Sequence, residues 1–265
     1  MKLDPTRWSA VYDERNATRA TRRFTRGVEI ACELYQEYSD ANQLWLDAGC
    51  GTGNLAKQLA SIATQKGSSI LAVDFDPDML SFGKSHAPQF EQANNPSFLC
   101  GDAQQLPFAD ASLDGVLATS LLGCLNAPEK HFRETHRVLK PGGIAVITFT
   151  NEKSLFLKTN NAIRFALNRV RQVHRKGQKY SSKKAEGAGD ADQRFRHYSV
   201  HWASHQLEQT GFRVQRVIFY NFFLELGNRI LLPPFAVHSA EQLSRVHGLR
   251  ELGQNFVVAA KRIGP

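Results

Sequence analysis

The segment that most constrains the fold is an apolar run that ends in an acidic residue and passes directly into a glycine-rich turn. Residues 44–54 carry glycines at the alternate positions 49, 51 and 53, and the apolar residues that follow recur at helical spacing. Glycine allows the positive φ angles of a tight turn and the close approach of a ligand to the backbone. The segment therefore predicts a strand, a turn and a helix whose free N–H groups and positive dipole end face a ligand.

The turn departs from the dinucleotide-binding fingerprint, which is Gly-x-Gly-x-x-Gly. Asn54 stands where that fingerprint has its third glycine, and Asp47 stands just before the turn. A carboxylate at this point repels a pyrophosphate but can pair with an ammonium group. The turn therefore favours a ligand with an amino acid end and disfavours a nicotinamide dehydrogenase, while a turn without any ligand is the alternative.

Composition narrows the class of protein. The 265 residues suffice for one α/β domain with insertions, and 42% hydrophobic with 22% charged residues is typical of a globular protein. No apolar stretch approaches ~18 residues, so no transmembrane helix is expected. The N-terminus lacks the apolar segment of a secretory signal. The four cysteines are far apart and lack zinc spacing, so we expect reduced thiols, no metal site and a cytoplasmic location.

Short apolar strands alternate with helices along the chain. Further strands are expected at 69–74, 97–100, 113–121 and 144–149, with helices that begin at 77 and 128. The alternation breaks at 152 and resumes with a helix over 200–209 and strands over 213–220 and 255–261. This order predicts a mostly parallel sheet that is covered by helices on both faces.

The chain divides into four predicted parts. Residues 1–40 form an N-terminal helical cap, 41–151 a cofactor-binding core, 152–197 a basic insertion or lid, and 198–265 the rest of the core with a second insertion over 221–250. The first insertion holds twelve basic and four acidic residues, and its charge of +8 equals the net charge of the whole chain. A membrane surface, a substrate and plain solvent are the open alternatives for this charge.

Four motifs, in this order, resemble those of the class I S-adenosylmethionine-dependent methyltransferases, in particular the small-molecule, methyltransferase type 11-like members. They are the loop over 46–53, Asp74 at the end of the second strand, residues 101–103 after the third and residues 139–143 before the fifth. The resemblance covers residues 40–151. It implies an α/β, Rossmann-like seven-stranded sheet with the last strand antiparallel, with S-adenosyl-L-methionine as cofactor and S-adenosyl-L-homocysteine as product.

The resemblance also implies which residues contact the cofactor. Asp47 and the loop would hold its methionine end, Asp74 its ribose hydroxyls and Asp102 its adenine amino group. The complete set of expected contacts is Tyr12, Asp47, Gly49, Cys50, Gly51, Asp74, Phe75, Met79, Asp102, Ala103 and Thr119. Core packing is the alternative for Tyr12, Phe75 and Met79, and helix capping is the alternative for the two aspartates Asp74 and Asp102.

Methyl transfer from a sulfonium is an in-line displacement, for which the protein supplies positioning and a dry cavity. A hydroxyl or an acidic carbon as acceptor also needs a general base. His197 and Tyr198 are the catalytic candidates because they lie at the mouth of the first insertion. His201 has no motif behind it, and His131 is expected at the surface.

The leading interpretation is a small-molecule biosynthesis enzyme that methylates an O, N or C atom. The two insertions would form its lid, with Phe222, Phe223 and Phe235 as an apolar pocket wall. Motifs of nucleic-acid base and protein arginine methyltransferases are absent after the fourth strand, so nucleic acid is disfavoured as a partner. The alternatives are a lipid or quinone methyltransferase that docks on an anionic membrane, an RNA methyltransferase and a non-catalytic cofactor-binding module. The core is similar to that of ubiquinone and menaquinone C-methyltransferases, whose C-terminal features are missing.

Overall fold

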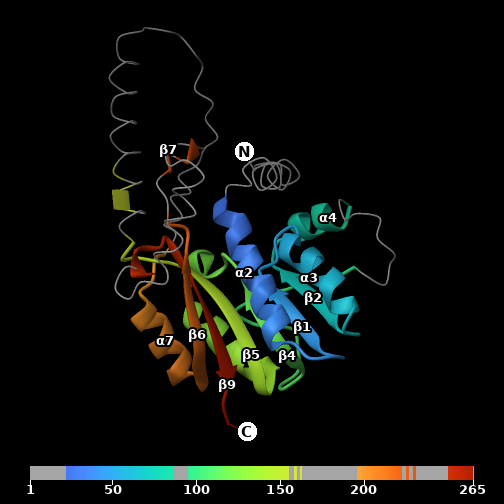
Figure 1. Ribbon diagram of the computed structural model, residues 1–265. Coiled ribbons are helices and arrows are strands. Elements are labelled where there is room, and N and C mark those ends of the chain that lie inside the picture. Colours follow the sequence, from blue (N-terminus) through green and yellow to red (C-terminus); the bar gives the residue numbers. More distant parts are fainter. Residues whose placement is uncertain are drawn as a thin grey trace, which may run out of the picture.

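The computed structural model describes a mixed sheet between layers of helices (Figure 1). The residues that it describes are 22–85, 95–154, 158–159, 162, 196–222, 225–226, 229–230 and 250–264. The sheet has seven strands in the order β3-β2-β1-β4-β5-β9-β6. The strands are β1 (Leu44–Ala48), β2 (Ser69–Asp74), β3 (Ser97–Cys100), β4 (Leu113–Ala118), β5 (Leu139–Thr150), β6 (Phe212–Tyr220) and β9 (Asn255–Arg262), and β7 (Glu225–Leu226) with β8 (Arg229–Ile230) forms a separate antiparallel pair.

The strand directions confirm the predicted sheet. Strands β1 to β5 pair in parallel, whereas β9 lies antiparallel between β5 and β6. The strand order reverses at β1, which pairs with β2 on one side and β4 on the other. In open α/β sheets a ligand binds beyond the carboxyl ends of the strands at such a reversal, so the topology locates the expected site next to the glycine-rich turn.

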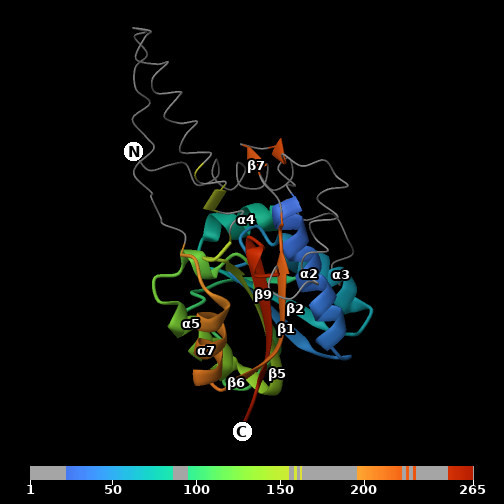
Figure 2. The ribbon, with the colours of Figure 1, turned by 60° about the vertical axis from the view of Figure 1, so that its left-hand side comes forward.

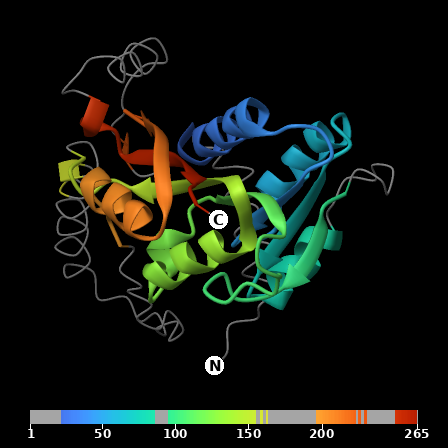
Figure 3. The same cartoon turned by 90° about the horizontal axis from the view of Figure 1, so that it is seen from below.

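Helices cover both faces of the sheet, as predicted. The helices are α2 (Arg22–Tyr38), α3 (Asn54–Thr64), α4 (Pro77–Ser85), α5 (Pro128–Val138) and α7 (Val200–Gln209), with short 3₁₀ turns η2 (Leu122–Cys124) and η4 (Arg250–Leu252). Figures 2 and 3 show α5 and α7 together on one side of the sheet and α2 with α3 on the other. Each side buries its own apolar cluster, because parallel strands are covered on both faces.

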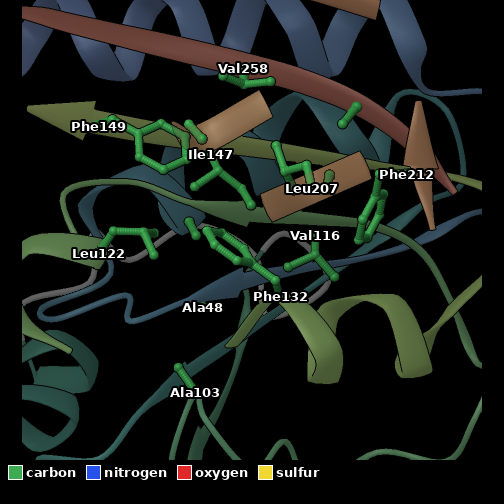
Figure 4. Packing of buried hydrophobic residues seen from close by; sticks show 14 of the residues in the cluster. Ala48, Ala103, Val116, Leu122, Phe132, Ile147, Phe149, Leu207, Phe212 and Val258 are labelled. Atoms are coloured by element: carbon green, nitrogen blue, oxygen red, sulfur yellow. The ribbon is translucent and has the colours of Figure 1, made fainter. Parts of the chain in front are cut away.

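Large aromatic side chains pack each of the two clusters against the sheet. On the α2 side, the rings of Tyr35 and Trp45 meet edge to face with centroids 4.9 Å apart. A Cβ at Gly115 of β4 would lie 2.2 Å from the Trp45 ring, so the indole occupies the space over that glycine. On the α5 side, Phe132 contacts Phe149 with ring centroids 6.4 Å apart (Figure 4). These contacts fix α2 against β1 and α5 against β5, while backbone pairing holds β1, β4 and β5 side by side.

Two strand boundaries differ from the prediction. The fourth strand ends at Ala118 rather than at residue 121, since Ser120 adopts a φ of 56° that no strand continues through. The fifth strand begins at Leu139, so residues 140–143 lie within it instead of in a preceding turn. In the described part of the chain, no helix has the length and apolar character needed to cross a membrane.

Several predictions fall outside the described residues. They include Tyr12, most of the basic insertion, Phe223 and Phe235. The first insertion begins just after β5, and Asn151 and Tyr198, which flank it, form a parallel bridge. Phe222, at the start of the second insertion, is only 1% exposed and belongs to the core on the α5 side. The four-part division itself stays a prediction.

Candidate active site

The glycine-rich turn joins β1 to α3 by backbone conformations that favour glycine. Gly49, Gly51 and Gly53 have φ angles of 71°, 55° and 75°. A Cβ at Gly49 would lie 2.6 Å from Leu121 Cδ1, and one at Gly53 would lie 2.5 Å from the Phe98 ring. The loop is therefore closely packed by its neighbours. No side chain caps the start of α3, so its first turn is left to a ligand or to water.

Asp47 lies at the end of β1 beneath this turn and is 1% exposed. Among the described residues, neither of its carboxylate oxygens has a hydrogen-bond partner. Burial raises the pKa of Asp47 to about 7; the backbone N–H of Ala56 in the first turn of α3, which falls outside hydrogen-bond geometry, opposes the rise, and the negative charge of Asp74 adds to it. A buried carboxylate without a partner is costly, which makes Asp47 ready to accept a cationic ligand.

Cys50 follows in the turn as a half-buried thiol. Burial, with the nearby Asp47 and Asp74, raises the pKa of this thiol far above its ordinary value. The side chain is therefore neutral, and its Sγ contacts the carbonyl of Gly51 at 3.7 Å. Cys50 can line the site, but its surroundings give no thiolate for chemistry.

Asp74 ends β2 and ties that strand to the turn. Its Oδ2 accepts a hydrogen bond from Gly51 N–H at 2.7 Å, and its Oδ1 accepts one from Asp76 N–H at 3.0 Å. The carboxylate thus holds the glycine-rich turn in place, and each oxygen keeps lone-pair capacity for a ligand hydroxyl. Capping of α4 is carried by Asp76 instead, since its Oδ1 accepts from the N–H groups of Asp78 and Met79.

Phe75 and Met79, both expected at the adenine, differ sharply in burial. Phe75 is 76% exposed, whereas Met79 is 9% exposed. The exposed ring of Phe75, next to Asp74, offers a flat apolar surface on which a ligand base can stack. Met79 is one of the buried residues of α4.

Asp102 and Ala103 lie in the loop after β3. Oδ1 of Asp102 accepts a hydrogen bond from Gln104 N–H at 2.8 Å, and the Asp102 carbonyl accepts one from Gln105 N–H at 2.9 Å. Asp102 is exposed, while Ala103 is 6% exposed. This turn presents the carboxylate at the same sheet edge as Asp74, because β2 and β3 are parallel neighbours.

Thr119 lies at the carboxyl end of β4, between that strand and the unusual Ser120. Thr119 is half-buried, and Ser120 is exposed at a φ of 56° with its N–H donating to Thr148 Oγ1 at 2.7 Å. Non-glycine residues with positive φ cluster at functional sites, where surrounding contacts maintain the strain. The sequence prediction named Thr119 but missed this backbone feature, for which it carries no signal.

The expected surface position of His131 is wrong. The side chain is fully buried in α5, with Nδ1 2.9 Å from the Ala103 carbonyl and Nε2 3.4 Å from Thr135 Oγ1. Burial lowers the pKa of His131, so the imidazole is neutral. The polar helix face that suggested a surface position instead binds the loop that carries Asp102. The sequence does carry one signal for this role: the i, i+3 spacing of His131 and Glu134 places both side chains on the same face of the helix.

His197 and Tyr198 lie together beside the first insertion but in different surroundings. His197 is exposed, whereas Tyr198 is 6% exposed and donates its hydroxyl to the Leu122 carbonyl at 2.9 Å. Burial raises the pKa of Tyr198. Its ring stacks on Trp202 with centroids 4.6 Å apart. The hydrogen bond to Leu122 therefore fixes the position of the Tyr198 hydroxyl, and a catalytic role for Tyr198 stays a prediction.

A cavity of about 560 Å³ lies between the N-terminal ends of α5 and α7. Charged and aromatic groups line it, including Glu129, Glu152, Arg196, His197 and Trp202. None of the described cofactor candidates lines this cavity, which lies next to the end of β5. His201 points elsewhere, and pairs at a ring-centroid distance of 6.3 Å with His205 on the exposed face of α7.

Comparison with known proteins agrees with this geometry. Residues 46–147 match the family model described as a methyltransferase domain. The chain is 38% identical over 104 residues to the biotin biosynthesis bifunctional protein of Cellvibrio japonicus, which covers 39% of this chain and 19% of that protein. It is 38% identical over 102 residues to the demethylmenaquinone methyltransferase of Renibacterium salmoninarum, which covers 38% of this chain and 39% of that protein.

The chain thus matches less than half the length of either relative. A solved structure of an S-adenosylmethionine-dependent methyltransferase from Methanosarcina mazei superimposes with a TM-score of 0.57 at 19% identity, over 88% of this chain and 98% of that one. That likeness shows the fold, and the family model covers the strands and loops that hold Asp47, Asp74 and Asp102. Residues 46–147 therefore match the methyltransferase domain model, and the chain has the fold of the class I S-adenosylmethionine-dependent methyltransferases.

Proposed function

We propose that this protein transfers a methyl group from S-adenosyl-L-methionine to a small-molecule acceptor. The observation that carries the proposal is the buried Asp47 carboxylate, which has no partner among the described residues and lies beneath a turn closed to side chains. An ammonium group would remove the cost of that unpaired charge. An exposed Phe75 ring and two carboxylates at the same edge fit the adenosyl end.

Residues at the carboxyl ends of neighbouring strands bind different parts of the cofactor in this proposal. Asp47 and the N–H groups of the turn hold the amino acid end, Asp74 the ribose hydroxyls, and Asp102 with Ala103 the base. Bound S-adenosylmethionine would supply an electrophilic methyl group: the lone pair of the acceptor would form the new bond to carbon, and the electrons of the carbon–sulfur bond would stay on sulfur. The chain contributes orientation and exclusion of water near Thr119 and Ser120.

His197 is our candidate for the base that takes a proton from the acceptor. It lines the cavity between α5 and α7 and is exposed, so a ligand can reach it. Tyr198 is the second candidate, although its hydroxyl already donates to Leu122. The identity of the acceptor atom decides whether a base is needed at all, because an amine can attack through its own lone pair.

The acceptor is a small molecule in this proposal. The two curated relatives are identical to this chain to the same extent, yet their names point to biotin and menaquinone biosynthesis. Identity in the cofactor half therefore does not separate one acceptor from another. A quinone or lipid acceptor at an anionic membrane is the second candidate, favoured by the basic insertion over 152–197. The free cysteines support a cytoplasmic location.

The test is transfer of a radiolabelled methyl group from S-adenosylmethionine into cell extract that is separated into organic, aqueous and acid-precipitable fractions. Label in the organic or aqueous fraction would support the proposal and assign an apolar or a polar acceptor. Label in the precipitate would replace it with RNA or protein methylation. A thermal shift with S-adenosylhomocysteine but no labelled product would favour a non-catalytic binding module.

A further inference from the structure

The loop that follows β3 is held by one face of α5. His131 Nδ1 lies 2.9 Å from the Ala103 carbonyl. Glu134 Oε2 accepts from Leu106 N–H at 2.8 Å, and Arg137 Nη2 donates to the Leu106 carbonyl at 2.9 Å. All these contacts are with backbone atoms of the loop. The helix therefore holds the loop through its backbone, and the loop side chains of Gln104 and Asp110 add contacts with Ala127 N–H and Arg137 Nη1.

The contact of His131 is the one nearest to Asp102, and its direction can be assigned. A carbonyl only accepts hydrogen bonds, so Nδ1 must carry the proton, and Nε2 then accepts from the hydroxyl of Thr135 at 3.4 Å. Burial lowers the pKa of His131, which keeps the ring in this neutral form. The imidazole is thus a fixed donor to the Ala103 carbonyl.

The Ala103 carbonyl shares a planar peptide unit with the N–H of Gln104. That N–H donates to Oδ1 of Asp102 at 2.8 Å. His131 and the Asp102 carboxylate therefore bind the two ends of one rigid peptide group. If the carbonyl lost its donor, the peptide could rotate and release Oδ1, and with it the orientation of the carboxylate.

We propose that His131 is a positioning residue for the base of the bound cofactor, acting on Asp102 through the peptide group between Ala103 and Gln104. Oδ1 accepts two hydrogen bonds from Gln104, from its N–H at 2.8 Å and from Nε2 at 3.4 Å, so Oδ2 is the oxygen left to orient toward an exocyclic amino group. This inference rests on the proposed function, since it takes the base to be adenine. It assigns a role to a buried histidine on the opposite side of the loop from the ligand.

The test compares S-adenosylhomocysteine with S-inosylhomocysteine, which carries an oxo group in place of the amino group. His131→Leu introduces an apolar side chain of similar volume and removes the donor. His131→Asn has a smaller side chain but places an N–H near the position of Nδ1. Phe132→Leu is the control, because it destabilises the same helix on the face that packs against Phe149 and Trp202.

We expect the Leu variant to bind S-adenosylhomocysteine about tenfold more weakly and to bind the two ligands almost equally, because a buried hydrogen bond is lost. The Asn variant and the Phe132→Leu control should keep the wild-type ratio of the two dissociation constants, even where their melting temperatures fall more. A purely structural role would instead make binding follow the melting temperature, and that result would overturn the inference.

Hydrogen exchange of the Gln104 and Gln105 amides gives a second measurement that needs no ligand. We expect faster exchange at both amides in His131→Leu and near wild-type exchange in His131→Asn. Unchanged exchange in the Leu variant would overturn the relay through the peptide. Failure of the wild-type protein to bind S-adenosylhomocysteine would overturn the proposed function, while the exchange result would still decide whether His131 orders the loop.

Discussion

The two halves of the sheet edge use their polar groups in different ways. At the β1–β2 end, Asp47 is buried without a partner among the described residues, and Phe75 is 76% exposed. At the β5–β9 end, several polar side chains of the described residues bind backbone carbonyls of the chain itself. Asn151 Nδ2 donates to the carbonyls of Glu251 and Gly253 at 2.7 and 2.8 Å, and Tyr198 donates to Leu122.

The difference separates a half that is prepared for a ligand from a half that anchors the insertions. An unpaired buried carboxylate costs stability, and such a cost is typical of a binding site. The contacts of Asn151 and Ser154 with residues 251–253 instead join the point where the first insertion leaves the sheet to the point where the second returns. We therefore expect substitutions at the two ends to separate ligand affinity from stability.

The largest effect is expected for Asp47→Asn. Removal of the charge should weaken S-adenosylhomocysteine binding roughly 100-fold, as expected when one partner of a buried ion pair is lost. The melting temperature of the free protein should not fall, because the amide avoids burial of an unpaired charge. Calorimetric titration and thermal denaturation measure the two quantities. Asp40→Asn, with the same charge change at the opposite end of the sheet, is the control. Equal affinity in both variants would show that Asp47 does not bind the ligand.

The pH dependence of binding should reflect the same carboxylate. The pKa of Asp47 is raised from 3.8 to about 7 in the free protein. An ammonium ligand requires the ionised form, so affinity for S-adenosylhomocysteine should rise by up to about tenfold per pH unit below pH 7 and level off above it. Dissociation constants measured between pH 5.5 and 8.5 would test this, and a flat profile in the wild type would contradict it.

Stability should change with pH in the opposite direction. Because the folded-state pKa of Asp47 is the higher one, the folded protein holds its proton more tightly than the unfolded chain. The stabilisation of the folded state that results is fully present below about pH 4 and is lost as the pH rises to about 7. Asp47→Asn should lack that loss, which denaturant titrations of the two proteins at pH 5 and pH 8 would detect.

A smaller effect is expected for Tyr198→Phe, at the anchoring end. The substitution removes the shorter of two hydrogen bonds to the Leu122 carbonyl, which keeps only Leu125 N–H at 3.4 Å, and should cost about 1–2 kcal/mol of unfolding free energy. Affinity for S-adenosylhomocysteine should change less than twofold. Denaturant titration and calorimetry provide these values. A loss of methyl transfer greater than about 100-fold at unchanged affinity would show that the hydroxyl acts in catalysis as well.

The smallest effect is expected for Arg216→Ala, which removes an ion pair between β6 and α2. Arg216 Nη1 lies 2.6 Å from Glu37 Oε2, but both side chains are about half exposed. Exposed pairs contribute about 0.2–1 kcal/mol and are screened by salt. Stability should fall by no more than this at low salt and by less at 0.5 M salt, with ligand affinity unchanged. A larger loss would mean that α2 depends on this contact for its docking.

The antiparallel last strand was implied by the family resemblance, whereas local patterns predicted the alternation of strands and helices and the turn at Gly49, Gly51 and Gly53. The alternation and the turn depend on residues close together in the sequence: apolar runs, glycine spacing and an acid at a strand end. The same patterns misplaced the end of the fourth strand. The positive φ of Ser120 is held by Thr148 on the neighbouring strand, a partner that no local pattern identifies.

The sequence by itself determined the α/β fold and, through the family resemblance of its motifs, the candidate cofactor edge and the residue types there, because strand and turn chemistry are local properties. Only the tertiary structure decided how those residues are used. The same helical spacing that suggests an exposed polar face places His131 in the interior, since the loop carrying Asp102 packs over α5 and supplies a carbonyl for its ring. Likewise Asp47 is left without a partner only because two strands and a helix enclose it, and enclosure is a property of packing rather than of sequence spacing.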